Sequence, residues 1–139
     1  MSATTPRRMT IRIDVRDGDL DELGHVNNAN YLRYAEEAAR AHSAARGFPL
    51  EAYMALGALP VVRKHEIRYR KPATAGEALD VTTELKRLDR RRATRHTDIR
   101  RASDGTLLAE AVTEWVWIDA EEGRLVSVPD GVLAAFEPD

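Results

Sequence analysis

The residues best suited to take part in a reaction lie in one short stretch, where Asp21 stands four positions before the run His25-Val26-Asn27-Asn28. We expect Asn27 or Asn28 to cap the start of a long helix, because an asparagine side chain accepts hydrogen bonds from the first free N–H groups of a helix. Those N–H groups and the helix dipole can hold a developing oxyanion. A carboxylate beside them can attack a thioester or ester carbonyl, or activate a water molecule. The alternative interpretation is that the acids only stabilise the helix start.

Several neighbouring residues are candidates for supporting roles. His25 is a candidate to polarise the carbonyl or to orient the carboxylate. The equally weighted alternative is a turn histidine that packs locally. The side chains of Asn27 and Asn28 fit caps better than catalysts, so the backbone is the expected oxyanion donor. Tyr31 fits packing or substrate contact. Glu36 lies about 12 Å from the helix start at 1.5 Å per residue, and it is a candidate second acid or base.

The charge distribution points to a phosphate-bearing small ligand. The net charge of the 139-residue chain is −2, but residues 86–101 hold eight basic and two acidic residues, a local charge of +6. Arg90, Arg91 and Arg92 are expected at a hairpin tip, where arginine forks match phosphate oxygens. No aromatic residue interleaves with these cations. A nucleotide-like tail therefore fits better than nucleic acid, and a plain solvated surface is the alternative.

Composition limits the class of protein. The length suits one domain with one core. Cysteine is absent, no apolar run could span a bilayer, and residues 1–10 lack the apolar core of a secretory signal. The histidines outside the first motif share no ligand spacing, so no metal site is expected. We therefore expect a cytoplasmic protein without a metal, a cofactor or a membrane partner.

Periodicity predicts an α+β fold. One long helix is expected at 28–46, because the segment is rich in alanine and ends before Gly47 and Pro49. Short helices are expected at 50–56 and 129–136. Alternating apolar residues predict strands at 9–15, 61–70, 79–86 and 107–118, and a fifth strand is expected at 93–101, where the alternate positions are almost all polar and Ile99 is the main apolar residue. Successive strands with tight connections favour an antiparallel sheet against the long helix.

The segment from Asp21 to Leu32 resembles the signature of hotdog-fold thioesterases of the 4-hydroxybenzoyl-CoA thioesterase type. Three later features occur in the order found in that family, and the resemblance covers nearly the whole chain as one domain, 1–139. These features are Tyr69-Arg70-Lys71-Pro72 with Gly76-Glu77, then Leu108-Ala109-Glu110-Ala111, then the helix after Pro129.

The resemblance implies a hotdog fold, in which a five-stranded antiparallel sheet wraps a long central helix. It also implies an acyl-CoA thioesterase that works as a homodimer or homotetramer, paired through the strand at 61–70, with active sites between protomers. Asp21 matches the catalytic carboxylate of the family, and the backbone N–H near Asn28 matches its oxyanion donor. The three arginines at 90–92 are candidates for binding the CoA nucleotide. Asp19 and Glu22 are expected to be bystanders.

Two alternatives remain at this stage. The motif also resembles acyl-ACP thioesterases, but those carry an asparagine two residues after the aspartate, where this chain has Leu23, and they contain two tandem hotdog domains. The hotdog dehydratase pattern is not found here, because dehydratases place their histidine and acid in a different sequence setting. A non-catalytic protein that binds acyl-CoA or an acyl carrier on the same fold is the second alternative.

Overall fold

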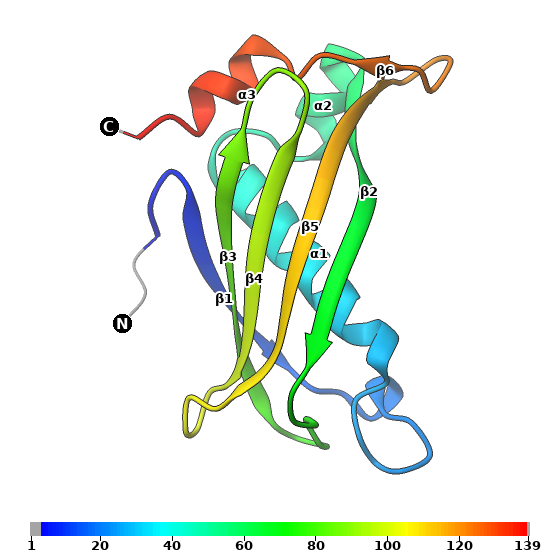
Figure 1. The fold of residues 1–139 in the computed structure, drawn as a ribbon, viewed down its shortest axis with the longest axis vertical. Coiled ribbons are helices and arrows are strands. Elements are labelled where there is room, and N and C mark those ends of the chain that lie inside the picture. Colours follow the sequence, from blue (N-terminus) through cyan, green and yellow to red (C-terminus); the bar gives the residue numbers. More distant parts are fainter. Residues whose placement is uncertain (1–3, 139) are drawn as a thin grey trace.

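A computed structural model describes residues 4–138, so the outermost residues of the expected domain, 1–3 and 139, lie outside the described residues. One long helix lies against the concave face of a curved sheet (Figure 1). The elements in chain order are β1 Arg8–Asp14, the 3₁₀ turn η1 Asp17–Asp19, α1 Asn28–Ala45, α2 Leu50–Leu56, β2 Ala58–Tyr69, β3 Ala78–Leu88, β4 Ala93–Arg101, β5 Leu107–Asp119, β6 Leu125–Val126 and α3 Asp130–Ala135.

The sheet is antiparallel throughout, with strand order β1-β3-β4-β5-β2. The expected count of five strands was wrong by one, since the two-residue strand β6 pairs with β5 and gives six strands among residues 4–138. Two residues are too few to show an alternating pattern. The turn before β6 holds it in place, because the Asp119 carboxylate accepts backbone hydrogen bonds from Glu121, Glu122 and Arg124.

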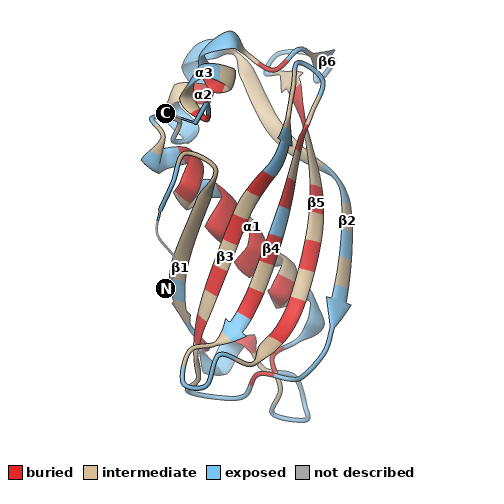
Figure 2. Cartoon of the chain, turned by 60° about the vertical axis from the view of Figure 1, so that its left-hand side comes forward, coloured by how far each residue is buried: buried red, intermediate tan, exposed pale blue. Residues whose placement is uncertain are grey.

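The alanine-rich helix α1 packs on the sheet through small and aromatic residues. Tyr34 and Ala38 are fully buried there, against Leu79, Ile99 and Leu108 of β3, β4 and β5. Figure 2 shows buried residues alternating with less buried ones along these strands. Small side chains on α1 let the strands approach closely, which a helix enclosed by a curved sheet requires.

A second group of buried residues closes the other end of the molecule. Tyr53 of α2, Trp117 of β5 and Val132 of α3 belong to this group, together with Phe136. The inner face of β4 is unusually polar at this end, because Arg95 and Thr97 are buried there. Through this buried group, the short helices α2 and α3 cover the end of the sheet that α1 does not reach.

The strand β2 lies at one edge of the sheet. Its twelve residues pair with β5 on one side, and within residues 4–138 no strand pairs with the other side. A long free edge is a ready template for pairing with another chain. No helix within residues 4–138 is both long and apolar enough to cross a membrane.

Candidate active site

The loop that carries Asp21 is fixed by its own backbone. The Asp21 N–H donates to the His25 carbonyl over 2.7 Å, and Asp21 Oδ1 accepts from the N–H groups of Leu23 at 2.9 Å and His25 at 3.2 Å. Gly24 turns the chain with φ +75°, a conformation that glycine adopts at little cost. Asp21 is exposed, and its second oxygen, Oδ2, has no hydrogen-bond partner among residues 4–138.

The helix start beside this loop offers an unused donor. Asn27 is the N-cap of α1, as expected, because its side-chain oxygen accepts from the Ala29 N–H over 2.9 Å, and its carbonyl accepts from Asn30. The Asn28 N–H has no acceptor among the described residues. The Asn28 carbonyl accepts from the Tyr69 hydroxyl over 2.9 Å. Asn28 is therefore held on one side and free to donate on the other.

Asp19 anchors the loop to the helix. Its carboxylate accepts from the Arg33 guanidinium at 2.6 Å, the Tyr34 hydroxyl at 2.8 Å and the Arg16 N–H at 3.2 Å. Burial alone raises the pKa of Asp19, but the hydrogen bonds from Tyr34 and Arg16 and the charge of Arg33 outweigh it and hold the pKa below its usual value. The expectation that Asp19 takes no direct part in the chemistry stays a prediction, and the structure shows that this side chain positions the loop. The contacts of Asp19 with Arg33 and Tyr34 are fixed by the tertiary fold and have no local sequence signal.

Two other predicted site residues differ in accessibility. Tyr31 is 2% exposed, and its hydroxyl accepts from the Ala73 N–H over 3.0 Å. Burial raises its pKa, and its ring meets Tyr69 edge-on at 5.4 Å. The protomer thus uses Tyr31 in packing. His25 is half-buried, and its imidazole makes no hydrogen bond with the described residues.

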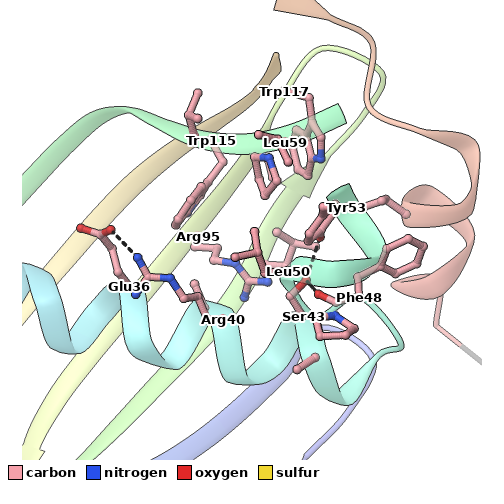
Figure 3. Close-up of a pocket in the computed structure, with 18 of the residues that line it drawn as sticks. Glu36, Arg40, Ser43, Phe48, Leu50, Tyr53, Leu59, Arg95, Trp115 and Trp117 are labelled. Carbon is pink, nitrogen blue, oxygen red and sulfur yellow. Dashed lines mark hydrogen bonds and ion pairs between the residues drawn. The ribbon is translucent and has the colours of Figure 1, made fainter. Parts of the chain in front are cut away.

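Glu36 lies at one end of a large cavity, away from the Asp21 loop. Its carboxylate pairs with Arg40 at 3.3 Å and faces His65 Nε2 at 3.7 Å. The cavity has a volume of about 670 Å³ and lies between α1, α2 and the sheet (Figure 3). Most of its wall is apolar, and residues that line it include Leu59, Val61, Leu85, Leu88, Trp115 and Trp117.

The predicted arginine tip is confirmed as the connection between β3 and β4. Arg90 pairs with Asp130 at 3.0 Å and Arg92 pairs with Glu114 at 2.6 Å. Arg90, Arg91 and Arg92 line a groove of about 370 Å³ together with Arg63. Since Arg63 shares Glu114 with Arg92, cations outnumber acids along this groove.

The described residues contain no group of three or more histidines, cysteines and carboxylates that could hold a metal ion. At the helix start the chain supplies a carboxylate, a free N–H donor and an imidazole. These groups suit attack on an activated carbonyl, with the oxyanion held by the backbone. A helix-on-sheet fold with this helix start defines the class of hotdog thioester hydrolases.

Comparison with known proteins agrees with that class. Residues 15–136 match the family model of the thioesterase-like superfamily, and the chain belongs to this family. The chain is 30% identical over 120 residues to the long-chain acyl-CoA thioesterase FadM of Escherichia coli, covering 86% of this chain and 90% of FadM.

Solved structures show the same architecture. A hypothetical protein from Thermus thermophilus superposes with a TM-score of 0.84 at 29% identity, covering 91% of this chain and 95% of that one. A 1,4-dihydroxy-2-naphthoyl-CoA thioesterase from Synechocystis superposes with a TM-score of 0.85 at 23% identity, covering 93% and 95%, and supports the fold. The predicted hotdog fold and the predicted class of thioester hydrolase are confirmed. The specific 4-hydroxybenzoyl-CoA type is not distinguished by these matches.

Proposed function

We propose that this protein hydrolyses acyl-CoA thioesters with Asp21 as the catalytic carboxylate and the Asn28 N–H as the oxyanion donor. The observation that carries the proposal is the helix start, where an exposed carboxylate with one free oxygen lies in the loop before an unpaired backbone N–H. The relationship to FadM supports an acyl-CoA substrate. The motif at residues 21–32 supports the finer placement in the 4-hydroxybenzoyl-CoA thioesterase type.

Two routes fit this geometry. In the first, Asp21 removes a proton from water as the water oxygen bonds to the thioester carbon. The Asn28 N–H holds the oxyanion, the carbon–sulfur bond then breaks, and the proton passes from Asp21 to the CoA thiolate. In the second route Asp21 attacks the carbon directly, CoA leaves, and water hydrolyses the resulting anhydride. His25 is the candidate to position water or the carbonyl in both.

The free edge of β2 supports a dimer in which two chains share each site. If β2 pairs antiparallel with its copy about the middle of the strand, the Ala58 end of one chain lies beside the Tyr69 end of the other. The first end lines the cavity, and the second is bonded to the helix start at Asn28. Each cavity then faces the Asp21 loop of the second copy. This places the acyl group in one protomer and the reacting carbonyl at the other.

The cationic groove formed by Arg63, Arg90, Arg91 and Arg92 is the proposed site for the CoA phosphates. Guanidinium groups bind phosphate oxygens in pairs, and those of Arg90 and Arg91 lie in the exposed loop between β3 and β4. Asn27 and Tyr31 then contribute by shaping the helix start. Glu36 lies at the cavity end of α1, where it can meet substrate. A cytoplasmic location stays part of the proposal.

The test is hydrolysis of a panel of acyl-CoA and acyl-ACP thioesters, followed by release of the free thiol. We expect thiol release from acyl-CoA with little from acyl-ACP, because Leu23 replaces the asparagine typical of acyl-ACP thioesterases. Faster thiol release from acyl-ACP than from acyl-CoA would assign the protein to acyl-ACP substrates instead. Tight binding of every acyl-CoA without thiol release would instead identify a binding protein and overturn the proposed activity.

A further inference from the structure

The cavity described above contains one feature that an aliphatic acyl group does not need. Arg95, on the inner face of β4, is 6% exposed and lines the cavity beside Trp115 and Trp117. Figure 3 shows its side chain extending between these tryptophans and α1. A guanidinium stays charged at neutral pH, so a full positive charge lies inside a largely apolar cavity.

Only some of the N–H donors of this guanidinium have a hydrogen-bond acceptor among the described residues. Arg95 Nη1 donates to His42 Nδ1 over 2.9 Å and to Thr83 Oγ1 over 3.1 Å, and the group lies 5.7 Å from the Phe136 ring. Nε and Nη2 make no hydrogen bond with the described residues. At least two donor groups of the fork therefore lack an acceptor among residues 4–138.

The charge of Arg95 also lacks a counterion. No carboxylate of residues 4–138 forms an ion pair with it, whereas arginines on the surface, such as Arg12 and Arg70, pair with acids. His42 is neutral, since burial and then the Arg95 charge lower its pKa to about 4. Burying an unpaired charge destabilises the folded protein, so a purely structural role does not account for this arginine.

Four uncharged polar side chains also line the cavity. Ser43 and Tyr53 satisfy each other, because their hydroxyls lie 2.7 Å apart. The indole N–H groups of Trp115 and Trp117 are buried with no hydrogen-bond partner among the described residues.

We propose that Arg95 is a specificity-determining residue that binds a carboxylate at the far end of the acyl group, so that the preferred substrates are ω-carboxyacyl-CoA thioesters. This inference rests on the proposed thioesterase function. A carboxylate matches the planar fork of a guanidinium and brings the missing negative charge. The apolar walls between Glu36 and Arg95 accommodate the carbon chain.

The place of Arg95 beside α1 sets the expected length of the acyl group. His42, the hydrogen-bond partner of Arg95, lies six residues beyond Glu36 at the cavity end, which is about 9 Å along the axis of α1. Three bonds of an extended chain span roughly 3.5 Å, so this distance corresponds to about eight bonds. We therefore expect a medium-length dicarboxylic acyl group rather than a short or a very long one.

The test compares hexanedioyl-CoA with hexanoyl-CoA, and octanedioyl-CoA with octanoyl-CoA, by kcat/KM. We expect the native protein to favour the ω-carboxylate in at least one pair by about tenfold or more, mainly through KM, as a charge-assisted hydrogen bond predicts. Arg95→Met should remove the preference, and Arg100→Met, an exposed arginine on the same strand, should keep it. Equal or weaker use of both ω-carboxy substrates by the native protein would overturn the proposal.

A second measurement separates this inference from the proposed activity. Equilibrium binding of the same CoA thioesters to the Asp21→Asn variant reports the carboxylate preference without turnover. If no thioester is hydrolysed but octanedioyl-CoA binds about tenfold tighter than octanoyl-CoA, the activity fails and the Arg95 site stands. Free octanedioate and octanoate, compared in the same assay, show whether the site takes a carboxylate without CoA. If neither form of the dicarboxylate binds better than its monocarboxylate, the site is refuted.

Discussion

The hydroxyl of Tyr69 donates a 2.9 Å hydrogen bond to the backbone carbonyl of Asn28. This bond ties the last residue of β2 to the first residue of α1, which are 41 positions apart. It fixes the peptide plane after Asn28, while the N–H of the same residue stays free to donate. The free edge strand and the proposed oxyanion donor are thereby parts of one rigid unit.

Removing that bond should slow the chemical step. We expect Tyr69→Phe to lower kcat about two- to tenfold with a smaller change in KM, because one ordinary hydrogen bond that positions the donor is lost. Steady-state kinetics with a saturating acyl-CoA measures the effect, and far-UV circular dichroism checks that the fold is kept. An unchanged kcat would show that the helix start needs no support from β2.

Replacing Asp19 should weaken the fold rather than the chemistry directly. Asp19→Asn removes the charge that Arg33 and Tyr34 share, and we expect a loss of about 2 kcal/mol in the free energy of unfolding. Urea denaturation at pH 7 measures this loss. Because the pKa of Asp19 is lowered in the folded state, its contribution is present above the ordinary value of 3.8 and is lost as the pH falls through the folded pKa. Equal stability of the variant and the native protein at pH 7 would contradict the anchoring role.

His42 should make stability depend on pH in a different range. Its pKa falls from 6.5 to about 4 on folding, through burial first and the charges of Arg95 and Arg46 after it. The unfolded chain therefore binds more protons between these values, and stability decreases as the pH falls from about 6.5 to about 4. The total is on the order of 3 kcal/mol.

The variant His42→Gln isolates this contribution, since glutamine can still accept from Arg95. We expect its free energy of unfolding to change less than that of the native protein between pH 7 and pH 4.5, measured by urea denaturation. A native protein whose stability is flat across this range would show that His42 is not neutral in the fold.

The shared site predicts that activity follows assembly. Sedimentation should give twice the chain mass of 15.6 kDa or a multiple of that dimer, and specific activity should fall on dilution as the dimer dissociates. Hydrogen exchange should show protected amides on both edges of β2, although only one edge pairs with β5 in the protomer. A monomer with full specific activity would contradict a site shared between copies.

Local patterns predicted most of the elements. The bounds of α2 agree with the expected helix at 50–56, and α1 begins at Asn28 because Asn27 caps it, as its position before the alanine-rich run indicated. The Asp104-Gly105 turn joins β4 and β5 as a hairpin, with Gly105 at φ +74°. These features depend on neighbouring residues, and such features are readable from sequence.

The misses depend on contacts between distant segments. The pairing of β2 with β5 rather than with its neighbour β3 has no local signal. The polar alternation of 93–101 gave no indication that Arg95 points inward and meets His42. The ion pair of Asp19 and Arg33 joins a turn to a helix face, and only the assembled fold brings those charges together.

The measurement that tests the central claim most directly is acyl-CoA turnover by the Asp21→Asn variant. Glu22→Gln is the matched control, because it removes the adjacent exposed carboxylate in the same loop. We expect Asp21→Asn to lower kcat about 100-fold or more and Glu22→Gln to stay near the native rate, with the same oligomeric mass in all three proteins. Near-native turnover by Asp21→Asn would contradict the assignment of Asp21 as the catalytic carboxylate.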